Sequence, residues 1–536
     1  MKPWRRGEGG WPWLAAGSVA LSLLMVAALL TLLGVRGLAH FWPAEVELVT
    51  LEGGDRFAGQ RVRHIEIKAE TKAEIKAEIK AEADGAAQTQ VLYLTGNRDL
   101  DGQYWRWIDA ERIKTRETPA DLIVLERQRW GEFIGRLVAL REGGATLMSL
   151  DAGDAALWQA LQARLARADA LRERREWLRE NQVEPLARRL AAGGEANPQS
   201  SHAELTAQLD EARARVADVQ QALARDSLVL ASVEGRRLEQ PIAEVIEAWR
   251  PNAMSTIDKL KHWGQRLWVF LSEGPRAANS AGGVWPAIFG TVLMVLLMSL
   301  IVTPFGVLAA VYLNEVARQG PLTRLVRIAV RNLAGVPSIV YGVFGLGVFV
   351  YGIGGSLDQW FFSDTLPSPT FGTGGLLWAS LTLALLTLPV VIVATEEGLA
   401  RIPDHQREGA LALGATRYET LRHVVLPMAM PAMLTGVILA VARAAGEVAP
   451  LMLVGAAKLV PQVPVDGEFP FLHLDSKFMH LGYHLYNVGF LGGDVERAMP
   501  LVYAIALLLV LIIVVLNLTA IFLRHHLRAR HRGLHR

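Results

Sequence analysis

The sequence contains no cysteine among its 536 residues. Disulfides, thiol catalysis and cysteine metal sites are therefore excluded. The chain also lacks the G-x-x-x-x-G-K-[ST] phosphate loop, the H-E-x-x-H zinc helix and the G-x-S-x-G nucleophile elbow. We expect a protein that is not an enzyme and holds no cofactor, so any ATP hydrolysis must come from another chain.

An excess of charge of one sign is also missing, because 55 Lys and Arg accompany 53 Asp and Glu. This balance says little about partners by itself, and we expect no nucleic-acid partner. Apolar residues, by contrast, make up 51% of the chain and are gathered into runs. A helix needs about 20 apolar residues to cross a bilayer core. Six runs reach that length, at about 12–35, 285–313, 333–353, 375–395, 430–456 and 498–523. The sequence therefore predicts an all-α polytopic membrane protein with six transmembrane helices.

Lysine and arginine near the ends of these runs set the expected orientation, because positively charged loops stay in the cytoplasm. These side chains precede the first run, follow the second and follow the last: Lys2, Arg5, Arg6, Arg318, Arg324, Arg327, Arg331 and the tail at 524–536. With six spans they fall on one side, whereas 354–374 and 457–497 become outside loops. We expect a multi-pass protein of the bacterial inner membrane, in contact with lipid, with both termini in the cytoplasm.

Between about residues 36 and 275 the chain is polar, and the expected orientation places this region in the periplasm. Its flanks carry alternating or β-branched residues between turn residues, which predicts strands. Its middle has apolar residues at alternating steps of four and three, which predicts a coiled-coil helical hairpin at about 153–226. We expect an α+β domain whose hairpin is a spacer that packs on itself. The alternative is a hairpin that docks a periplasmic partner.

Two smaller features are given their simplest interpretation. The repeat KAETKAEIKAEIKAE at 68–82 drifts around a helix, so it presents no fixed binding face and is expected to be a solvated insertion. His480 and His484, with His473 and Asp475 nearby, have a possible metal-ligand spacing. We favour a solvated loop there and expect no metal.

The stretch EGALALGATRYETLRHVVLP at 408–427 lies between two apolar runs. Asp404 marks a helix start and Gly414 supplies a left-handed stop. Thr416 and Glu419 then form a capping box for a second short helix. Three apolar side chains lie between the charges: Leu411, Leu413 and Tyr418. This helix-turn-helix surface is suited to a groove on a partner.

The pattern E-G-A-x3-G-x9-V-x-L-P in this stretch resembles the EAA loop of ABC importer permeases, and the spacing matches throughout. The residues that carry the match are Glu408, Gly409, Ala410, Gly414, Val424, Leu426 and Pro427. Gly409 stands where Ala is usual and Val424 where Ile is usual, and both changes are conservative in size. The resemblance implies that residues 404–422 are the coupling loop, which rests in a groove of the ATPase and carries its closure to the membrane spans.

The next apolar run contains AVARAAGEVAPLM, in which Arg443 and Glu447 lie within an otherwise apolar helix. Each charge costs at least about 2.5 kcal/mol by insertion scales and normally faces the bundle interior or a water-filled pathway. At i and i+4 the two share one helix face, and Gly446 beside them leaves room for close backbone approach. We favour an anion station, where guanidinium can hold phosphate oxygens, over an ion pair that locks two helices.

A second block narrows the resemblance. NLAGVPSIVYGVFGLGVF at 332–349, together with RAAGEVAPLM and VWPAIFGT, resembles the PstA-type permease subunit of the phosphate ABC importer over about 255–525. This implies three kinds of partner: a second permease subunit, a pair of ATPase subunits and a periplasmic phosphate-binding protein. It also implies that Arg443 attracts the anion, while Glu447 orients Arg443 or limits how tightly phosphate is held. The polar insertion departs from shorter family members.

The expected organisation is a cytoplasmic N-terminus and first span at 1–35, a periplasmic domain at 36–275, an ABC permease core at 276–525 and a basic tail at 526–536. The expected function is that of a permease subunit in an ATP-driven importer of inorganic phosphate. One alternative is a permease for another oxyanion, such as sulfate or molybdate. The other is a membrane sensor, which should carry a cytoplasmic output domain, and the tail after Leu523 is too short for one.

Overall fold

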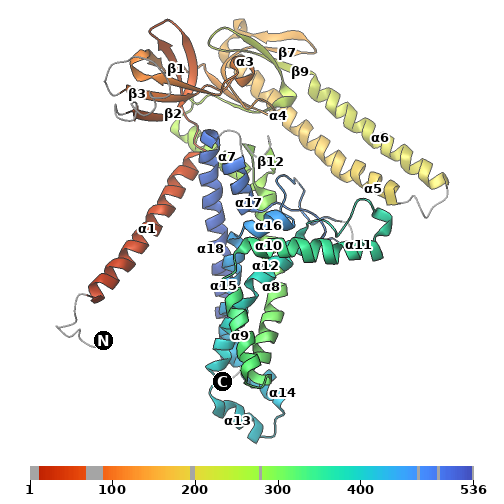
Figure 1. The fold of residues 1–536 in the computed structure, drawn as a ribbon. Helices are drawn as coiled ribbons and strands as arrows, with labels where there is room; N and C mark the ends of the chain where they lie inside the picture. Colours follow the sequence, from red (N-terminus) through yellow and green to blue (C-terminus); the bar gives the residue numbers. More distant parts are fainter. Residues whose placement is uncertain are drawn as a thin grey trace, which may run out of the picture. The chain divides into compact units, whose positions relative to one another are not determined.

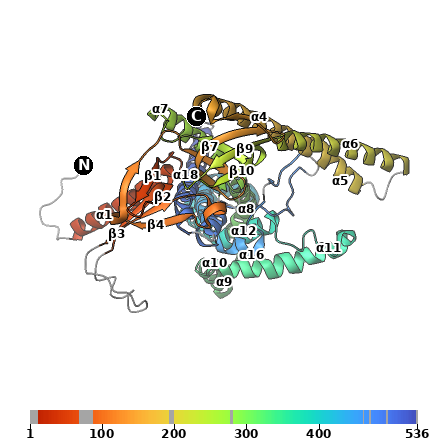
Figure 2. The same cartoon turned by 90° about the horizontal axis from the view of Figure 1, so that it is seen from above.

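The computed structural model describes residues 11–67, 88–192, 199–276, 281–460, 462–467, 471–491 and 495–533. The repeat at 68–82 lies outside these residues. The chain divides into two compact units. We call Trp42–Gly264 the polar unit, and Met1–Phe41 with Gln265–Arg536 the membrane unit. Figure 1 shows the ribbon of the chain, and Figure 2 shows the same ribbon turned by 90°.

Two antiparallel sheets form the core of the polar unit. The first has the order β4-β3-β2-β1-β5, and the second has the order β10-β9-β7-β6-β11 with β8 paired to β7. The strands of the first sheet are β1 (Val46–Leu51), β2 (Arg56–Ile67), β3 (Gln88–Leu94), β4 (Trp105–Asp109) and β5 (Ile113–Glu117). Those of the second are β6 (Ile123–Arg127), β7 (Glu132–Glu142), β8 (Ala145–Ser149), β9 (Asp226–Ala231), β10 (Arg237–Pro241) and β11 (Val245–Trp249). The strands predicted for the flanks of this region are therefore present.

A helical pair projects from the second sheet (Figure 1). α4 (Asp154–Leu178) continues through a π-helical turn into α5 (Glu184–Ala192), and α6 (Gln199–Ala224) packs against both. The buried seam consists of Leu157, Leu161, Leu165, Ala168, Leu209, Ala212 and Leu223. The paired helices lie where the hairpin was expected, while coiled-coil geometry stays a prediction.

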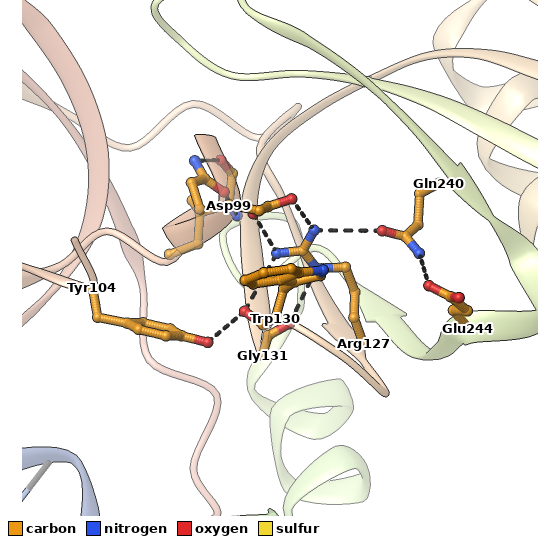
Figure 3. Close-up of polar contacts among 9 residues, drawn as sticks. Asp99, Tyr104, Arg127, Trp130, Gly131, Gln240 and Glu244 are labelled. Carbon is orange, nitrogen blue, oxygen red and sulfur yellow. Dashed lines mark hydrogen bonds and ion pairs between the residues drawn. The ribbon is translucent and has the colours of Figure 1, made fainter. Parts of the chain in front are cut away.

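The short helix α3 (Arg98–Asp101) fastens the two sheets of the polar unit to each other. The Asn97 side chain accepts from the Ile134 amide and donates to the Ile134 carbonyl, at 2.9 and 2.8 Å. The buried Arg127 side chain makes two bonds of 2.8 and 2.9 Å to Asp99 (Figure 3). Because these partners come from different sheets, they fix the first sheet against the second within this unit.

The membrane unit is a bundle of long apolar helices. Within the described residues, six helices are long and apolar enough to cross a membrane, in agreement with the sequence. The long ones are α1 (Trp11–Ala39), α8 (Trp285–Val311), α12 (Leu376–Ala400), α15 (Leu426–Gly446) and α18 (Val495–Gly533). α12 is the most buried of them and packs against α8 and α15, and α15 also packs against α18. α12 is therefore held between α8 and α15, while α1 packs against α18.

The third span is interrupted and displaced from its predicted position. The sequence predicted one helix over 333–353, but α9 (Pro321–Leu333) ends first, and the spanning segment is Ser338–Phe361. That segment comprises α10 (Ser338–Phe344), a π-helical stretch and α11 (Gly355–Phe361), and in Figure 1 it extends sideways from the bundle. The break falls at Pro337, because proline has no N–H to donate and disfavours helical backbone in the residue before it.

Short elements complete the membrane unit. They are α7 (Thr256–Ser272), which crosses the boundary between the units, the strand pair β12 (Pro275–Arg276) and β13 (Ala281–Gly282), α13 (Asp404–Ala412), α14 (Arg417–Thr420), α16 (Ala449–Val454) and α17 (Leu481–Tyr486). In Figure 1, α13 and α14 lie at one end of the bundle and α16 and α17 toward the other. Residues 404–422 and the segment after Arg443 are therefore separated along the helices.

Candidate functional site

The fifth span ends in the middle of the run that the sequence predicted as one helix. α15 stops at Gly446, Glu447 has extended backbone (φ −80, ψ 130), and α16 begins at Ala449. The prediction of a continuous helix over 430–456 is therefore wrong. Pro450 explains the break, because its ring would clash with the carbonyl four residues earlier and it has no N–H to donate.

Arg443 and Glu447 meet at this break. Arg443 Nε lies 3.5 Å from Glu447 Oε1, and the two side chains are 32% and 21% exposed. The contact is longer than the roughly 2.7–2.9 Å of a strong charge-assisted hydrogen bond. Glu447 thus reaches the guanidinium from outside the helix, and the pair is loose and partly exposed.

The second helix break contributes Tyr341 to the same neighbourhood. The Tyr341 hydroxyl donates to the Leu333 carbonyl at 2.7 Å, across the interruption between α9 and α10. Tyr341 is buried in the same apolar cluster as Val441, Ala444 and Ala445 of α15. The sequence gave no sign that α10 and this part of α15 pack together.

Close backbone contact at this junction comes from Gly342. A Cβ at Gly342 would lie 2.7 Å from the Cα of Pro450, so only glycine lets α10 approach α16 this closely. A Cβ at Gly446 would meet no atom within 4 Å. The expectation that Gly446 permits a close backbone approach is therefore not met in this structure.

Residues 404–422 have the local structure that the sequence predicted. α13 begins at Asp404, Gly414 is left-handed with φ +87, and Thr416 and Glu419 form a complete capping box. Hydrogen bonding from Thr416 lowers the pKa of Glu419, which keeps the cap charged. Glu408, Gly409 and the three apolar side chains of the stretch are exposed; Leu413 is 91% and Tyr418 66% exposed.

The chain on either side of this loop is seated in an apolar cluster. Ile402 and Val425 are buried together with residues from the ends of α8 and α12, among them Leu313 and Leu399. Leu426 packs against the same cluster, and Pro427 opens α15. The loop is therefore an exposed surface on a packed base.

Four charged residues that the sequence analysis did not select as site residues join this base. Arg407 pairs with Glu315 at 2.9 Å, and Arg327 pairs with Glu396 at 3.0 Å. The partners lie 92 and 69 positions apart in the chain. In the sequence these four residues are visible only as charges next to membrane spans, and that signal does not show which of them pair.

The segment expected to be a solvated loop is buried at His480 and His484. His480 Nδ1 accepts from the Gly482 amide, so its Nε2 carries the proton and cannot bind a metal ion. No group of three metal-binding side chains is found among the described residues. The expectation of solvation is wrong because α17 packs against α8 and α18.

Chemically, the junction at Arg443 is suited to brief anion contact. A guanidinium has five N–H donors in a planar fork that fits oxyanions. The loose pair with Glu447 offers a competing carboxylate, which opposes tight binding. Helices interrupted at polar residues and packed inside a bundle are a recurrent way to build a site within a membrane.

Comparison with known proteins places the chain among transport proteins. Residues 302–533 match the family described as "Binding-protein-dependent transport system inner membrane component". The phosphate transport system permease protein PstA of Mycobacterium leprae is 35% identical over 39% of this chain and 62% of its own length. The probable ABC transporter permease protein YqgH of Bacillus subtilis is 34% identical over 37% of this chain and 60% of its own.

Further comparisons also found transport proteins. PstA of Yersinia pestis is 35% identical over 35% of this chain and 58% of its own length. The chain thus spans about three fifths of the length of these curated relatives. An inward-facing structure of the MetNI methionine ABC transporter matches 51% of this chain and 99% of that chain, with 20% identity and a TM-score of 0.33. A score this low does not establish a shared fold.

These relatives are permeases rather than enzymes, as the sequence led us to expect. The family match over residues 302–533 includes the interrupted helices, the pair at Arg443 and the loop at 404–422. Residues 302–533 belong to the family of binding-protein-dependent transport system inner membrane components, in a multi-pass membrane protein that is similar to PstA-type permeases.

Proposed function

We propose that this chain is a permease subunit of an ATP-driven ABC importer that moves inorganic phosphate into the cytoplasm. The observation that carries the proposal is the loose pair of Arg443 and Glu447 at an interrupted helix within a permease family segment. The PstA relatives, whose names specify phosphate transport, support phosphate as the substrate.

In this proposal Arg443 attracts the anion and Glu447 competes with it. The carboxylate holds the guanidinium in place between transport events and keeps phosphate from staying. Weak holding matters because a substrate that binds too well does not leave. Gly446 ends α15 at the point where the two side chains meet.

The test of the site is phosphate uptake by cells that lack the gene and receive wild type, Arg443→Gln or Glu447→Gln. Arg443→Gln removes the cation and should abolish uptake. Glu447→Gln frees the guanidinium, so it should lower the external concentration needed for half-maximal uptake and slow the maximal rate. Equal uptake by all three chains at equal membrane levels would reduce the pair to a structural contact.

The proposed partners follow from the exposed loop at 404–422. A pair of ATPase subunits would dock on Leu411, Leu413 and Tyr418, a second permease would complete the pathway, and a periplasmic binding protein would deliver phosphate. The orientation with both termini in the cytoplasm puts the loop on the ATPase side. Leu413→Asp should reduce copurification of the ATPase, because it adds charge to an apolar knob; undiminished recovery would argue against docking there.

The role of the polar unit stays open within this proposal. Buried residues of its helical pair, among them Leu157, Leu161 and Leu223, pack into one cluster with the second sheet, and we keep the spacer that the sequence suggested as the simpler proposal over a docking arm. The domain limits expected from the sequence, 36–275 for the periplasmic part and 276–525 for the permease core, are part of the proposal. Protease protection in sealed cells would test them, since the polar unit should be cut from outside and the loop at 404–422 should not.

A further inference from the structure

Arg407 ties the loop at 404–422 to the ends of two membrane helices. From α13 its Nη2 donates to Glu315 Oε1 at 2.9 Å and to the Leu399 carbonyl at 3.0 Å. Its Nη1 donates to the Ile402 carbonyl at 2.7 Å. One planar fork thus bonds to the segment that ends α8 and to the C-terminal end of α12.

A second arginine, Arg327, bonds to the ends of the same two helices. Arg327 from α9 contacts Glu396 of α12 at 3.0 Å and donates to the Leu313 carbonyl at 2.9 Å. The guanidinium groups of Arg407 and Arg327 therefore both bond to the π-helical turn Tyr312–Val316, one from α13 and the other from α9. Local π-helical turns are frequent at functional positions, and here the turn lies between the loop and the span.

Burial makes the Arg407 tie stiff. The Arg407 and Glu315 side chains are only 19% and 18% exposed, so water competes little with their bond. The surrounding apolar cluster holds Leu313, Leu399 and Ile402 together. A displacement of α13 must consequently move the ends of α8 and α12, or break these bonds.

The direction of the Arg407 side chain separates it from the docking surface. It makes three hydrogen bonds to its own chain across the base, whereas Leu413 and Tyr418 extend into solvent. We propose that Arg407 is a positioning residue that converts motion of the loop at 404–422 into motion of α8 and α12. This inference rests on the proposed ATP-driven function.

The test compares phosphate moved with ATP hydrolysed in the same vesicles. The complex is purified through a tag on this chain, reconstituted, and supplied with the binding protein, radiolabelled phosphate and ATP. Four variants are measured: Arg407→Gln, Glu315→Gln, the double variant, and Arg401→Gln, an exposed arginine just before the loop, as matched control.

Arg407→Gln should retain the ATPase and its hydrolysis, while phosphate moved per ATP falls at least about fivefold, the lower end of typical coupling effects. Glu315→Gln should act in the same direction, and the double variant should be no worse than Arg407→Gln, because both cut one tie. Arg401→Gln should leave the ratio unchanged. This pattern separates transmission from docking.

An unchanged ratio in Arg407→Gln would overturn the inference, and so would loss of the ATPase from the purified complex, which would make Arg407 a docking residue. Should Arg407→Gln fail to assemble, Arg407→Lys keeps the charge for Glu315 but carries all its donors on one nitrogen, so it cannot reproduce the bonds that Nη1 and Nη2 make separately. A wild-type ratio in Arg407→Lys would contradict a tie that depends on the guanidinium fork. A wild-type complex that recovers no ATPase would instead contradict the proposed function itself.

Discussion

At the scale of single residues, the proposed pathway combines a loosely paired guanidinium with a buried hydroxyl. Arg443 lies 3.5 Å from its carboxylate partner, and Tyr341 bonds at 2.7 Å to the carbonyl that ends α9. The first contact is easily exchanged for an anion, and the second holds the interrupted helix in place. In the proposed function Arg443 contacts the anion, while Tyr341 holds the backbone at the interruption between α9 and α10.

Tyr341→Phe should destabilise the protein by about 0.5–1.5 kcal/mol, because it removes a partly buried hydrogen bond to the Leu333 carbonyl, which keeps its bond from the Val336 amide. Thermal unfolding of the purified protein measures the change. Tyr351→Phe is the control, since Tyr351 is exposed in the same span. Equal melting temperatures for the two variants would show that the hydroxyl contributes nothing.

His480 and His484 should make the segment around α17 sensitive to acid. Burial lowers the pKa of His480 to about 3 and of His484 to about 4. Below a pH of about 6.5 the unfolded segment takes up protons that the folded one does not, so stability falls as the pH drops through this window. Hydrogen exchange of residues 478–491, corrected for intrinsic rates, should be faster at about pH 5 than at about pH 7.5.

The matched variant for this acid effect carries His480→Asn and His484→Asn together. It removes both titrating groups, so the pH dependence of exchange should disappear while the segment remains folded at neutral pH. Protection that does not change with pH in the wild type would contradict the assignment of two buried neutral imidazoles.

At the scale of elements, backbone conformation at Gly414 decides the shape of the loop at 404–422. Its φ of +87 is strained for residues with a side chain, and Asn tolerates it best among them. Gly414→Ala should cost about 1–2 kcal/mol locally and reduce copurification of the ATPase. Gly414→Asn should retain most of it. Equal recovery with Ala and Asn would show that the turn does not depend on this conformation.

Sequence reasoning succeeded where the signal was local. Apolar runs identified the spans, and Gly414 with Thr416 and Glu419 located both short helices of the loop. It failed at Pro337 and Pro450, where hydrophobicity continues but the helix does not. Both breaks could have been predicted from these prolines, because proline disfavours a continuous helix.

Long-range pairs could not be predicted at all. The pair of Arg407 and Glu315, and the packing of Tyr341 against α15, depend on which helices pack together, and a single sequence carries no direct record of that. The same holds for His480 and His484, which looked solvated because the surrounding loop is polar. Local patterns fixed the elements, and packing determined which side chains met.

At the scale of the whole molecule, the polar unit has its own sheets, helical pair and ion pairs. Residues Trp42–Gly264 expressed alone should therefore fold into a monomer with one cooperative unfolding transition. Circular dichroism during heating measures this. In that fragment Arg127→Ala should cost about 3–5 kcal/mol, because it leaves Asp99 without its partner in a partly buried pair. A fragment without cooperative unfolding would contradict the independence of the unit.

In the membrane unit the pair at Arg443 and the loop at 404–422 are separated along the helices. The proposed function links the two through ATP-driven import of phosphate. The most direct measurement is uptake of radiolabelled phosphate by vesicles that contain the purified complex and the binding protein, with ATP on the side of the loop at 404–422. The proposed function predicts uptake that requires ATP and is lost in Arg443→Gln. Unlabelled phosphate should block this uptake, whereas sulfate and molybdate should not. Uptake of sulfate or molybdate in preference to phosphate, or no ATP-dependent uptake at all, would contradict it.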